Sequence, residues 1–307
     1  MKWTKLTHIF APDKNYAWMQ SHAANPFAVY LNENVYRIYF TCRDLENKSH
    51  IGFVDVDFSD SYKIITISSE PVVAPGELGM FDDSGVAMGY YIEVNQIPHI
   101  YYLGWNLKVT VPWLNTVGLA KQNLVTGKFE KVSRAPIMDR SDEDPFSISY
   151  PTILFEDGIY KMWYGSNLKW GKLQHEMNHV IKYAESIDGY KWNRKNMIAV
   201  NNVHEGEYAL SKPFVIKDNG TYYMWYSYRG NKNIDTYRIG YATSSDGLNW
   251  ERKDNGVGID VAKDGWDSNM ICYPFVFEHK GVKYMLYNGN DYGKTGFGIA
   301  ILKNEKN

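Results

Sequence analysis

The stretch SISYPTILFEDGIYKMWYG (147–165) recurs twice more in this chain in a changed form. The later copies read ALSKPFVIKDNGTYYMWYS (209–227) and MICYPFVFEHKGVKYMLYN (270–288). Each copy has a proline, then a turn, then a tyrosine-rich segment with a methionine eleven positions after the proline. The three prolines are Pro151, Pro213 and Pro274. Their spacing of 62 and 61 residues indicates an internal repeat.

Two earlier segments extend this repeat to the rest of the chain. ANPFAVYLNENVYRIYF (24–40) matches on Pro26, with one residue inserted before its second strand. DDSGVAMGYYIEV (82–94) aligns with WDSNMICYPFVF (266–277), which places Tyr90 where the proline would be. The anchor positions therefore mark units of 61 to 64 residues, and five such units fill the 307 residues.

Each unit reads as short strand, turn, strand, longer loop, strand, turn, strand. The third strands are IGFVDVD (51–57), VGLAKQ (117–122), VIKYAES (180–186), RIGYATS (238–244) and GFGIAIL (296–302). Apolar and small or polar residues alternate in them, which predicts half-buried strands. Asp-Gly and Asn-Gly pairs supply the positive φ of tight hairpins. The pattern predicts an all-β fold, a single domain over residues 1–307 that forms a five-bladed β-propeller with four antiparallel strands per blade.

The N-terminal segment MKWTKLTHIF (1–10) resembles the last strand of a unit. DGYKWNRKNMIAV (188–200) and DGLNWERKDNGVGIDV (246–261) carry the same aromatic, polar and basic signature. The fifth unit reaches only its third strand before the chain ends. Because an open sheet edge invites aggregation, we expect the N-terminal strand to pair into the last blade and close the ring.

Composition narrows the class of protein. The net charge is −2 and no Lys/Arg block occurs, so we expect neither a nucleic acid nor an anionic membrane as partner. Two cysteines are too few for a disulfide framework. The N-terminus lacks the apolar stretch of a signal peptide, and no apolar run is long enough for a membrane helix. These features predict a cytoplasmic protein, and no motif calls for a cofactor.

The blade pattern resembles the five-bladed glycosidase superfamily. Its marks are an inner-strand proline, a tyrosine-rich second strand and SxDGxxW turns, and its members include invertases, arabinanases, levansucrases and mannoside phosphorylases (glycoside hydrolase families 32, 43, 68 and 130). In the hydrolases, acids stand just before the inner-strand prolines of blades one, three and four. Here those positions hold Asn25, Tyr150 and Ser211. Hydrolysis by the usual carboxylate pair is therefore not carried over.

Other acids remain as candidates for catalysis. Asp83, Asp144 and Asp267 each lie seven positions before an anchor, and such recurrence favours a structural role in a turn. Asp82 has no counterpart in units three and five, and Glu207 also departs from the repeat. The catalytic hypothesis therefore names Asp82, Asp83 and Glu207.

A five-bladed propeller has a narrow central channel, and its mouth is the expected pocket. We expect several basic residues to meet there. Lys212 precedes Pro213, where Tyr150 and Tyr273 stand in other units, and needs an anion that is either Glu207 or a ligand. Arg43 and Arg229 occupy equivalent loops, and His22 lies four positions before Pro26. Together they predict an anionic ligand: a sugar phosphate, a nucleotide-sugar diphosphate or an acidic sugar. The other substrate-binding candidates are Asn25, Tyr150, Tyr273 and Asn290.

The segment HEMNH (175–179) matches the H-E-x-x-H zinc motif in letters only. That motif needs a helix to bring both histidines to one face, whereas this segment runs into a predicted strand. We therefore predict no metal site, and His175 and His179 remain candidates as proton donors or sugar ligands.

Two classes of function remain open. One is a carbohydrate-active, glycosidase-like enzyme (hydrolase, phosphorylase or glycosyl-transfer enzyme) for an anionic saccharide or co-substrate, with surface polysaccharides as one setting. The other is a non-catalytic propeller that binds saccharides or serves as a scaffold. The missing acids favour the second, and the ionisable residues of the channel mouth favour the first.

Overall fold

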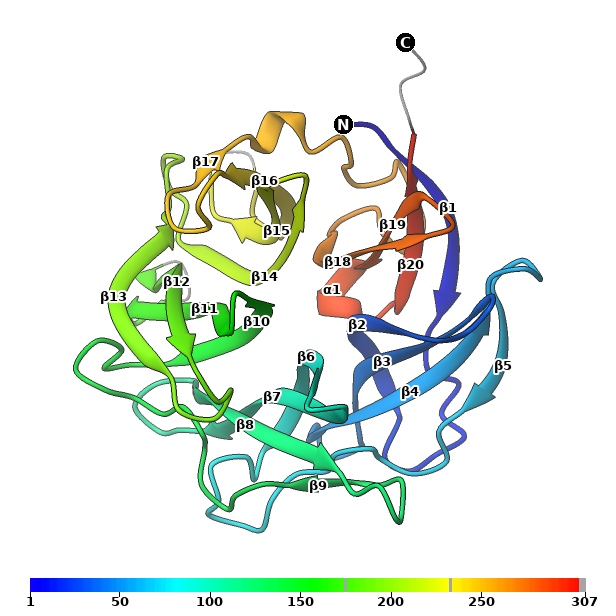
Figure 1. Ribbon diagram of the computed structural model, residues 1–307, viewed down its shortest axis with the longest axis horizontal. Helices are drawn as coiled ribbons and strands as arrows, with labels where there is room; N and C mark the ends of the chain where they lie inside the picture. Colours follow the sequence, from blue (N-terminus) through cyan, green and yellow to red (C-terminus); the bar gives the residue numbers. More distant parts are fainter. Residues whose placement is uncertain (174–175, 232–233, 304–307) are drawn as a thin grey trace.

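The computed structural model describes residues 1–173, 176–231 and 234–303, and its regular structure is almost entirely β-strand. Figure 1 shows sheets placed around a central axis. The innermost strands are β2 (Ser21–Asn32), β6 (Gly85–Val94), β10 (Ile148–Glu156), β14 (Ala209–Asp218) and β18 (Cys272–His279). The fold is thus all-β and propeller-like, as the repeat predicts.

From each innermost strand the chain runs outward through antiparallel neighbours, which we call a strand group. Group 1 continues with β3 (Val35–Arg43), β4 (Ser49–Asp57) and β5 (Lys63–Ile67). Group 2 continues with β7 (Ile97–Leu107), β8 (Trp113–Gln122) and β9 (Phe129–Lys131). Group 3 continues with β11 (Ile159–Lys169), β12 (Asn178–Ser186) and β13 (Asn193–Val200).

The last two groups follow the same course. Group 4 continues with β15 (Thr221–Arg229), β16 (Arg238–Ser244) and β17 (Glu251–Arg252). Group 5 continues with β19 (Val282–Asn288), β20 (Phe297–Leu302) and β1 (Trp3–Phe10). A short 3₁₀ turn, η2 (Asp254–Gly256), follows β17, and the short turn α1 (Asn290–Gly293) follows β19.

The first strand of the chain completes the last group. β1 pairs antiparallel with β20, from Trp3 opposite Leu302 to Phe10 opposite Phe297. Trp3 and Phe10 are both buried. The N-terminal segment is therefore an integral strand of group 5, and its two large rings belong to the hydrophobic core.

Side-chain acceptors link neighbouring groups near the axis. Thr41 Oγ1 accepts the backbone N–H of Met88 at 2.8 Å, and Ser227 Oγ accepts that of Tyr273 at 2.8 Å. Asn288 Oδ1 accepts the N–H of Asn25 at 2.7 Å, which joins group 5 to group 1. The join between the two ends of the repeat is thus made by the same kind of contact as the joins within it.

A bulge recurs in four of the innermost strands. The residue before each inner proline has a positive φ, namely Asn25 (55°), Tyr150 (38°), Lys212 (49°) and Tyr273 (55°). The strand register shifts at these positions. Positive φ is uncommon for residues other than glycine, and a bulge turns a side chain to a new direction. Here the bulges occur next to the axis.

The register of β6 corrects one sequence alignment. Tyr91 pairs with Ile100 as Ile153 pairs with Met162, so Gly89 rather than Tyr90 lies level with the inner prolines. The expected alignment was one residue off because β6 has no proline to mark this level; its register shift, between Met88 and Tyr90, lies at the level of the other bulges.

Aromatic rings fill the axis of the molecule. The rings of Phe27 and Phe275 lie 4.3 Å apart, and those of Phe214 and Phe275 lie 4.6 Å apart, measured between centroids. Tyr90 packs on Phe27 at 5.0 Å. These residues form a buried plug across the channel. No helix in the described part of the chain is long and apolar enough to cross a membrane.

Candidate functional site: a central cavity

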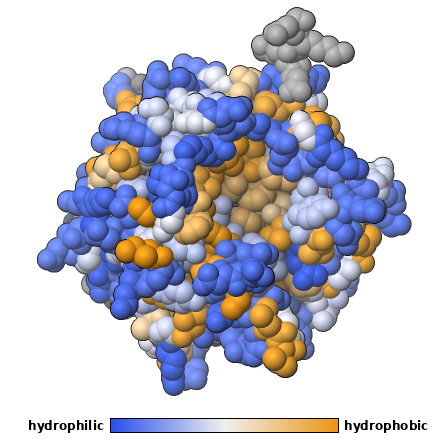
Figure 2. Space-filling view, viewed as in Figure 1, coloured by the Kyte–Doolittle hydropathy of each residue, from blue (hydrophilic) through white to orange (hydrophobic). Residues whose placement is uncertain are grey.

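A cavity of about 400 Å³ opens at the middle of the face seen in Figure 2, where the surface is hollowed. We call it the central cavity. All five strand groups line it, through residues that include His22, Trp105, Ser149, Ser211 and Tyr292. Among the described residues that line it there is no aspartate or glutamate. Its charged groups are two arginines, Arg43 and Arg229.

Arg43, the last residue of β3, lines the cavity. We call the part of the cavity around it the Arg43 end. Its Nη1 donates to Asn47 Oδ1 at 2.8 Å, and its guanidinium lies 5.8 Å from the Trp105 ring. No described carboxylate forms an ion pair with it. Burial and the nearby charges of Arg43 and Lys294 lower the pKa of His22 to about 4. The imidazole is therefore neutral at pH 7.

Arg229, the last residue of β15, also lines the cavity. We call the part of the cavity around it the Arg229 end. It is 5% exposed, and its Nη1 donates to the Tyr292 hydroxyl at 2.6 Å. Its Nε is buried without a hydrogen-bond partner. The rings of Tyr237 and Tyr208 lie 4.5 and 5.2 Å from the guanidinium. This arginine has an aromatic cage but no described carboxylate partner.

His179 and Asn167 lie beside the Arg229 end. They face one another across β11 and β12, and His179 lines the cavity. Burial and the charge of Arg229 lower the pKa of His179 to about 4. Its Nε2 and both amide atoms of Asn167 are buried without a partner. His179 Nε2 is thus an unsatisfied polar atom of a cavity-lining residue that a ligand could bond, whereas Asn167 is not among the lining residues.

Asn25, Tyr150 and Tyr273 also line the cavity, at the bulged positions. The rings of Tyr150 and Tyr273 lie 5.7 Å apart. Burial raises the pKa of both phenols. They are protonated at neutral pH and can donate hydrogen bonds to a ligand. The sequence singled out all three, and the structure brings them together.

Lys212 lies beneath the cavity and is not among its lining residues. It is 3% exposed, its Nζ donates to the Gly89 carbonyl, and the Nζ lies 5.8 Å from the Tyr150 ring. Burial lowers its pKa to about 7. The expected anionic partner, Glu207 or a ligand, is replaced by a backbone carbonyl of group 2.

The structure corrects the assignment of the repeated aspartates. Asp82, not Asp83, is the counterpart of Asp144 and Asp267, because a tyrosine twenty positions later donates to each of these three carboxylates. Each also has a cationic partner: Lys131 Nζ lies 2.6 Å from Asp82, Lys182 Nζ 3.1 Å from Asp144 and Lys5 Nζ 2.6 Å from Asp267. The expected uniqueness of Asp82 was wrong because of the alignment offset in β6.

Asp83 is the residue that departs from the repeat, and it holds a turn. It accepts the backbone N–H of Gly79 at 2.9 Å and the Asn106 side-chain amide at 2.6 Å. Burial raises its pKa, but these bonds and one from Ser84 outweigh that effect and leave the pKa lowered. Neither Asp82 nor Asp83 lines the central cavity.

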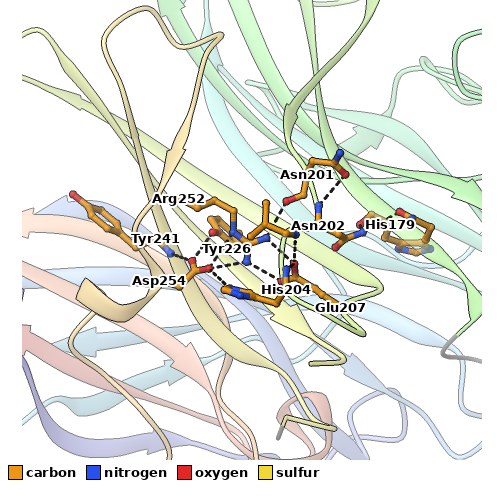
Figure 3. Close-up of polar contacts among 11 residues, drawn as sticks. His179, Asn201, Asn202, His204, Glu207, Tyr226, Tyr241, Arg252 and Asp254 are labelled. Atoms are coloured by element: carbon orange, nitrogen blue, oxygen red, sulfur yellow. Dashed lines mark hydrogen bonds and ion pairs between the residues drawn. The ribbon is translucent and has the colours of Figure 1, made fainter. Parts of the chain in front are cut away.

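Glu207 is enclosed in a separate network (Figure 3). Its two oxygens accept bonds of 2.8 and 2.7 Å from Arg252, and Oε2 also accepts the N–H of Val203 at 2.8 Å. Asp254 shares the same guanidinium at 2.7 Å and accepts from His204. The carboxylate is buried and does not line the cavity. The geometry supports a structural role for Glu207.

The remaining predicted candidates have mixed positions. Asn290 is held in a turn, where its Oδ1 accepts the N–H groups of Asn269 and Met270. His175 lies outside the described residues. His179 is in β12, so the helix needed for a zinc motif is not formed there. Within the described ranges, no group of three or more potential ligands could hold a metal.

Tyr237, Tyr292 and Asn47 were not singled out from the sequence, yet they line the cavity. Tyrosine is so frequent in this chain that no pattern separates those around Arg229 from those in the core. Tyr237 and Tyr292 contact Arg229, and Asn47 contacts Arg43, from segments that only the fold brings together.

Sequence comparison gives relatives that match over the full chain. This chain is 46% identical over 304 residues to the "uncharacterized protein Rv1502" of Mycobacterium tuberculosis, covering 99% of this chain and 100% of that protein. It is also 30% identical over 142 residues to a 1,2-β-oligomannan phosphorylase of Thermoanaerobacter, covering 43% and 46% of the two chains. No family model matches the sequence.

Solved structures share the fold at low identity. A glycoside hydrolase superposes with a TM-score of 0.75 at 16% identity, covering 97% of this chain and 90% of its own. A structure from the GH130 family of mannoside phosphorylases, which contains glycoside hydrolases that target β-1,2-mannosidic linkages in Candida mannan, has a TM-score of 0.69. Its identity is 14%, covering 99% of this chain and 94% of its own. The likeness extends over nearly the whole chain.

Proposed function

This chain belongs to one family with the Mycobacterium tuberculosis protein Rv1502, within the propeller glycosidase superfamily, and on that premise we propose that it is a carbohydrate-active enzyme. Its substrate is a saccharide that carries an anionic group or reacts with an anionic co-substrate in the central cavity. In this proposal the strand groups are five blades of four strands, with β1 as the outer strand of the last.

One observation carries the anionic part of the proposal. Arg43 and Arg229 face a cavity whose described lining contains no carboxylate. A buried charge is costly unless it is paired, and Arg229 is buried whereas Arg43 is partly exposed. A ligand that supplies negative charge would offset Arg229 and would also attract Arg43, which a neutral saccharide would not do.

The same observation bears on the kind of reaction. Hydrolysis by a carboxylate pair needs an acid and a base on either side of the glycosidic bond, and the described cavity lining has neither. An inorganic phosphate bound by arginine is itself a nucleophile and needs no carboxylate base. Phosphorolysis is therefore the reaction that the residues favour, and the partial match to an oligomannan phosphorylase supports it. The Tyr150 phenol, which lines the cavity and is protonated at neutral pH, is then an available proton donor.

The test measures turnover and binding together. We expect β-1,2-mannobiose and inorganic phosphate to yield mannose 1-phosphate, and mannose 1-phosphate to bind more tightly than mannose by calorimetry. Because a charge-assisted contact contributes about 1.5–3 kcal/mol, Arg43→Gln should weaken mannose 1-phosphate binding roughly tenfold to a hundredfold. Lys48→Gln, an exposed lysine paired with Glu46, is the matched control.

The alternative is a non-catalytic propeller that binds saccharides, and the absence of carboxylates from the cavity lining favours it. Binding that depends on Arg43, with no product across a panel of disaccharides and phosphate, would select this alternative. Equal affinities for mannose and mannose 1-phosphate, unchanged in Arg43→Gln, would contradict the anionic-ligand proposal itself.

A further inference from the structure

We infer that Arg229 binds the carboxylate of an acidic sugar, so that the saccharide accepted by the central cavity contains a hexuronate. This inference rests on the proposed function, because it specifies the saccharide taken by the same cavity. It concerns the Arg229 end alone and leaves the Arg43 end to the anionic co-substrate.

Arg229 differs from the other deeply buried cations of the described chain. The Lys182 side chain is 2% exposed and pairs with Asp144, and the Arg252 side chain is 8% exposed and pairs with Glu207. Arg229 has no such partner. An arginine cannot release its proton in a protein, whereas a buried lysine such as Lys212 can. The charge at Arg229 is therefore permanent and must be offset from outside the chain.

The cage around Arg229 leaves the guanidinium incompletely bonded. Tyr237 and Tyr208 contact it through their rings, and Tyr292 takes Nη1. Cation–π contacts offset part of the desolvation cost but supply no hydrogen-bond acceptor for Nε. Asp235 is exposed and forms no ion pair with Arg229. The cage is thus complete on the faces of the guanidinium and lacks an acceptor at its edge.

The neighbouring polar atoms match the rest of a sugar ring. His179 Nε2 and the amide of Asn167 are buried and unpartnered beside the Arg229 end. A neutral imidazole and an amide each bond hydroxyl groups, as donor and as acceptor. His179 lines the cavity and Asn167 lies directly behind it as its strand partner. A carboxylate on Arg229 with an adjacent hydroxyl on His179 is the chemistry of a sugar acid rather than of a lone inorganic anion.

Charge balance favours a carboxylate over a phosphoryl group at this end. Arg43 and Arg229 are the two cations of the described cavity lining, and Arg229 is the buried one. One buried cation offsets one negative charge, and a phosphate monoester carries close to two at neutral pH. A monoanion therefore fits the Arg229 end, and arginine binds a carboxylate with a suitable donor geometry.

The experiment compares three methyl glycosides in the gluco and manno series by calorimetry: the hexoside, the hexuronide and the hexoside 6-phosphate. We expect the hexuronide to bind at least tenfold more tightly than the hexoside. Arg229→Gln should remove that preference while leaving hexoside affinity unchanged, and Arg229→Lys should keep part of it. Arg238→Gln, on β16 and paired with Asp260, is the matched control and should keep all of it.

Stability provides a second readout that a purely structural arginine would not match. If Arg229 awaits a ligand, Arg229→Gln removes an unpaired charge, and its melting temperature should equal or exceed that of the parent. Arg252→Gln, which breaks a buried pair, should be clearly destabilised. A loss in Arg229→Gln as large as that in Arg252→Gln would overturn the inference.

The outcomes separate this inference from the proposed function. Absence of any saccharide binding, neutral or anionic, would overturn both. Binding of mannose 1-phosphate that depends on Arg43, together with no hexuronide preference, would overturn only the inference about Arg229. A hexuronide preference that survives Arg229→Gln would do the same, as would tighter binding of the 6-phosphate through Arg229.

Discussion

Two regions of this molecule use the same residue types in opposite ways. In the loops before the innermost strands of groups 2, 3 and 5, Asp82, Asp144 and Asp267 each accept a hydrogen bond from a tyrosine hydroxyl and pair with a lysine of the same group. In the central cavity, tyrosines and arginines gather with no described carboxylate. These three acids hold the fold together, and the arginines without a described carboxylate partner lie at the proposed ligand site.

The comparison teaches how to interpret a buried charge. A paired buried ion contributes little net stability, but removing one partner leaves an uncompensated charge that costs several kcal/mol. Replacing Asp82, Asp144 or Asp267 should therefore lower the stability of the protein. Replacing an arginine of the cavity should leave stability unchanged and weaken ligand binding instead. Three changes test this contrast, beginning with the largest expected effect.

Deletion of residues 1–10 breaks the paired region where the chain ends meet. It removes the pairing of β1 with β20, the buried rings of Trp3 and Phe10, and the cation that Lys5 gives Asp267. Each lost ring costs about 3–5 kcal/mol, so we expect insoluble protein or a melting temperature lower by roughly 10 °C or more. Differential scanning calorimetry measures it.

Point variants in the same strand provide the control for that truncation. Trp3→Ala should destabilise strongly, whereas Leu6→Ala, at a position that is 40% exposed, should change little. A truncated protein as stable as the full chain would contradict a structural role for β1 in group 5.

Asp144→Asn tests one of these three buried aspartates. The carboxylate accepts from Tyr164 and Ser166 and pairs with Lys182 and Arg194, so its neutralisation leaves two buried cations without an anion. We expect a loss of about 3–5 kcal/mol in the free energy of unfolding, measured by urea denaturation. Asp142→Asn, two positions away and exposed, is the control. An equal loss of unfolding free energy in the two variants would mean that the ion pairs of the buried aspartates do not stabilise the protein.

The spacing of the repeat was enough to predict the all-β fold and the place of the N-terminal strand. Both follow from period-two patterning and from a missing strand in the last unit. The level of the bulge in β6 was not predictable, because Gly89 stands there and no proline marks it. Matching Tyr90 instead of Gly89 to the inner prolines shifted the alignment by one residue, exchanged Asp82 with Asp83 and made a repeated aspartate look unique.

The site was predictable to the extent that it lies on repeated positions. Arg43, Tyr150 and Tyr273 stand at equivalent loops or bulges, and all three line one cavity. The partner of Glu207 was not predictable, since Arg252 lies 45 residues away on β17. A single sequence does not reveal which charges pair across such distances, so an acid that departs from the repeat is easily mistaken for a catalytic one.

Lys212 is buried and has no described carboxylate partner, but it does not line the cavity. It gives the last test. Burial lowers its pKa from 10.5 to about 7, so between these values the unfolded chain holds a proton that the folded chain has released. The stability of the parent protein therefore rises with pH in this window, by at most about 1.4 kcal/mol per pH unit. Below pH 7 both states hold the proton and the cost of the buried charge is present in full. Lys212→Met lacks this cost, so its advantage in unfolding free energy should be largest near pH 7 and shrink toward pH 10. Urea denaturation at pH 7, 8 and 9 measures the difference, and Lys63→Met, on an exposed lysine, controls for the loss of one positive charge. A difference that does not change with pH would mean that the Lys212 ammonium has an anionic partner. Lys212 would then belong with the paired charges of the molecule rather than with the unpaired ones.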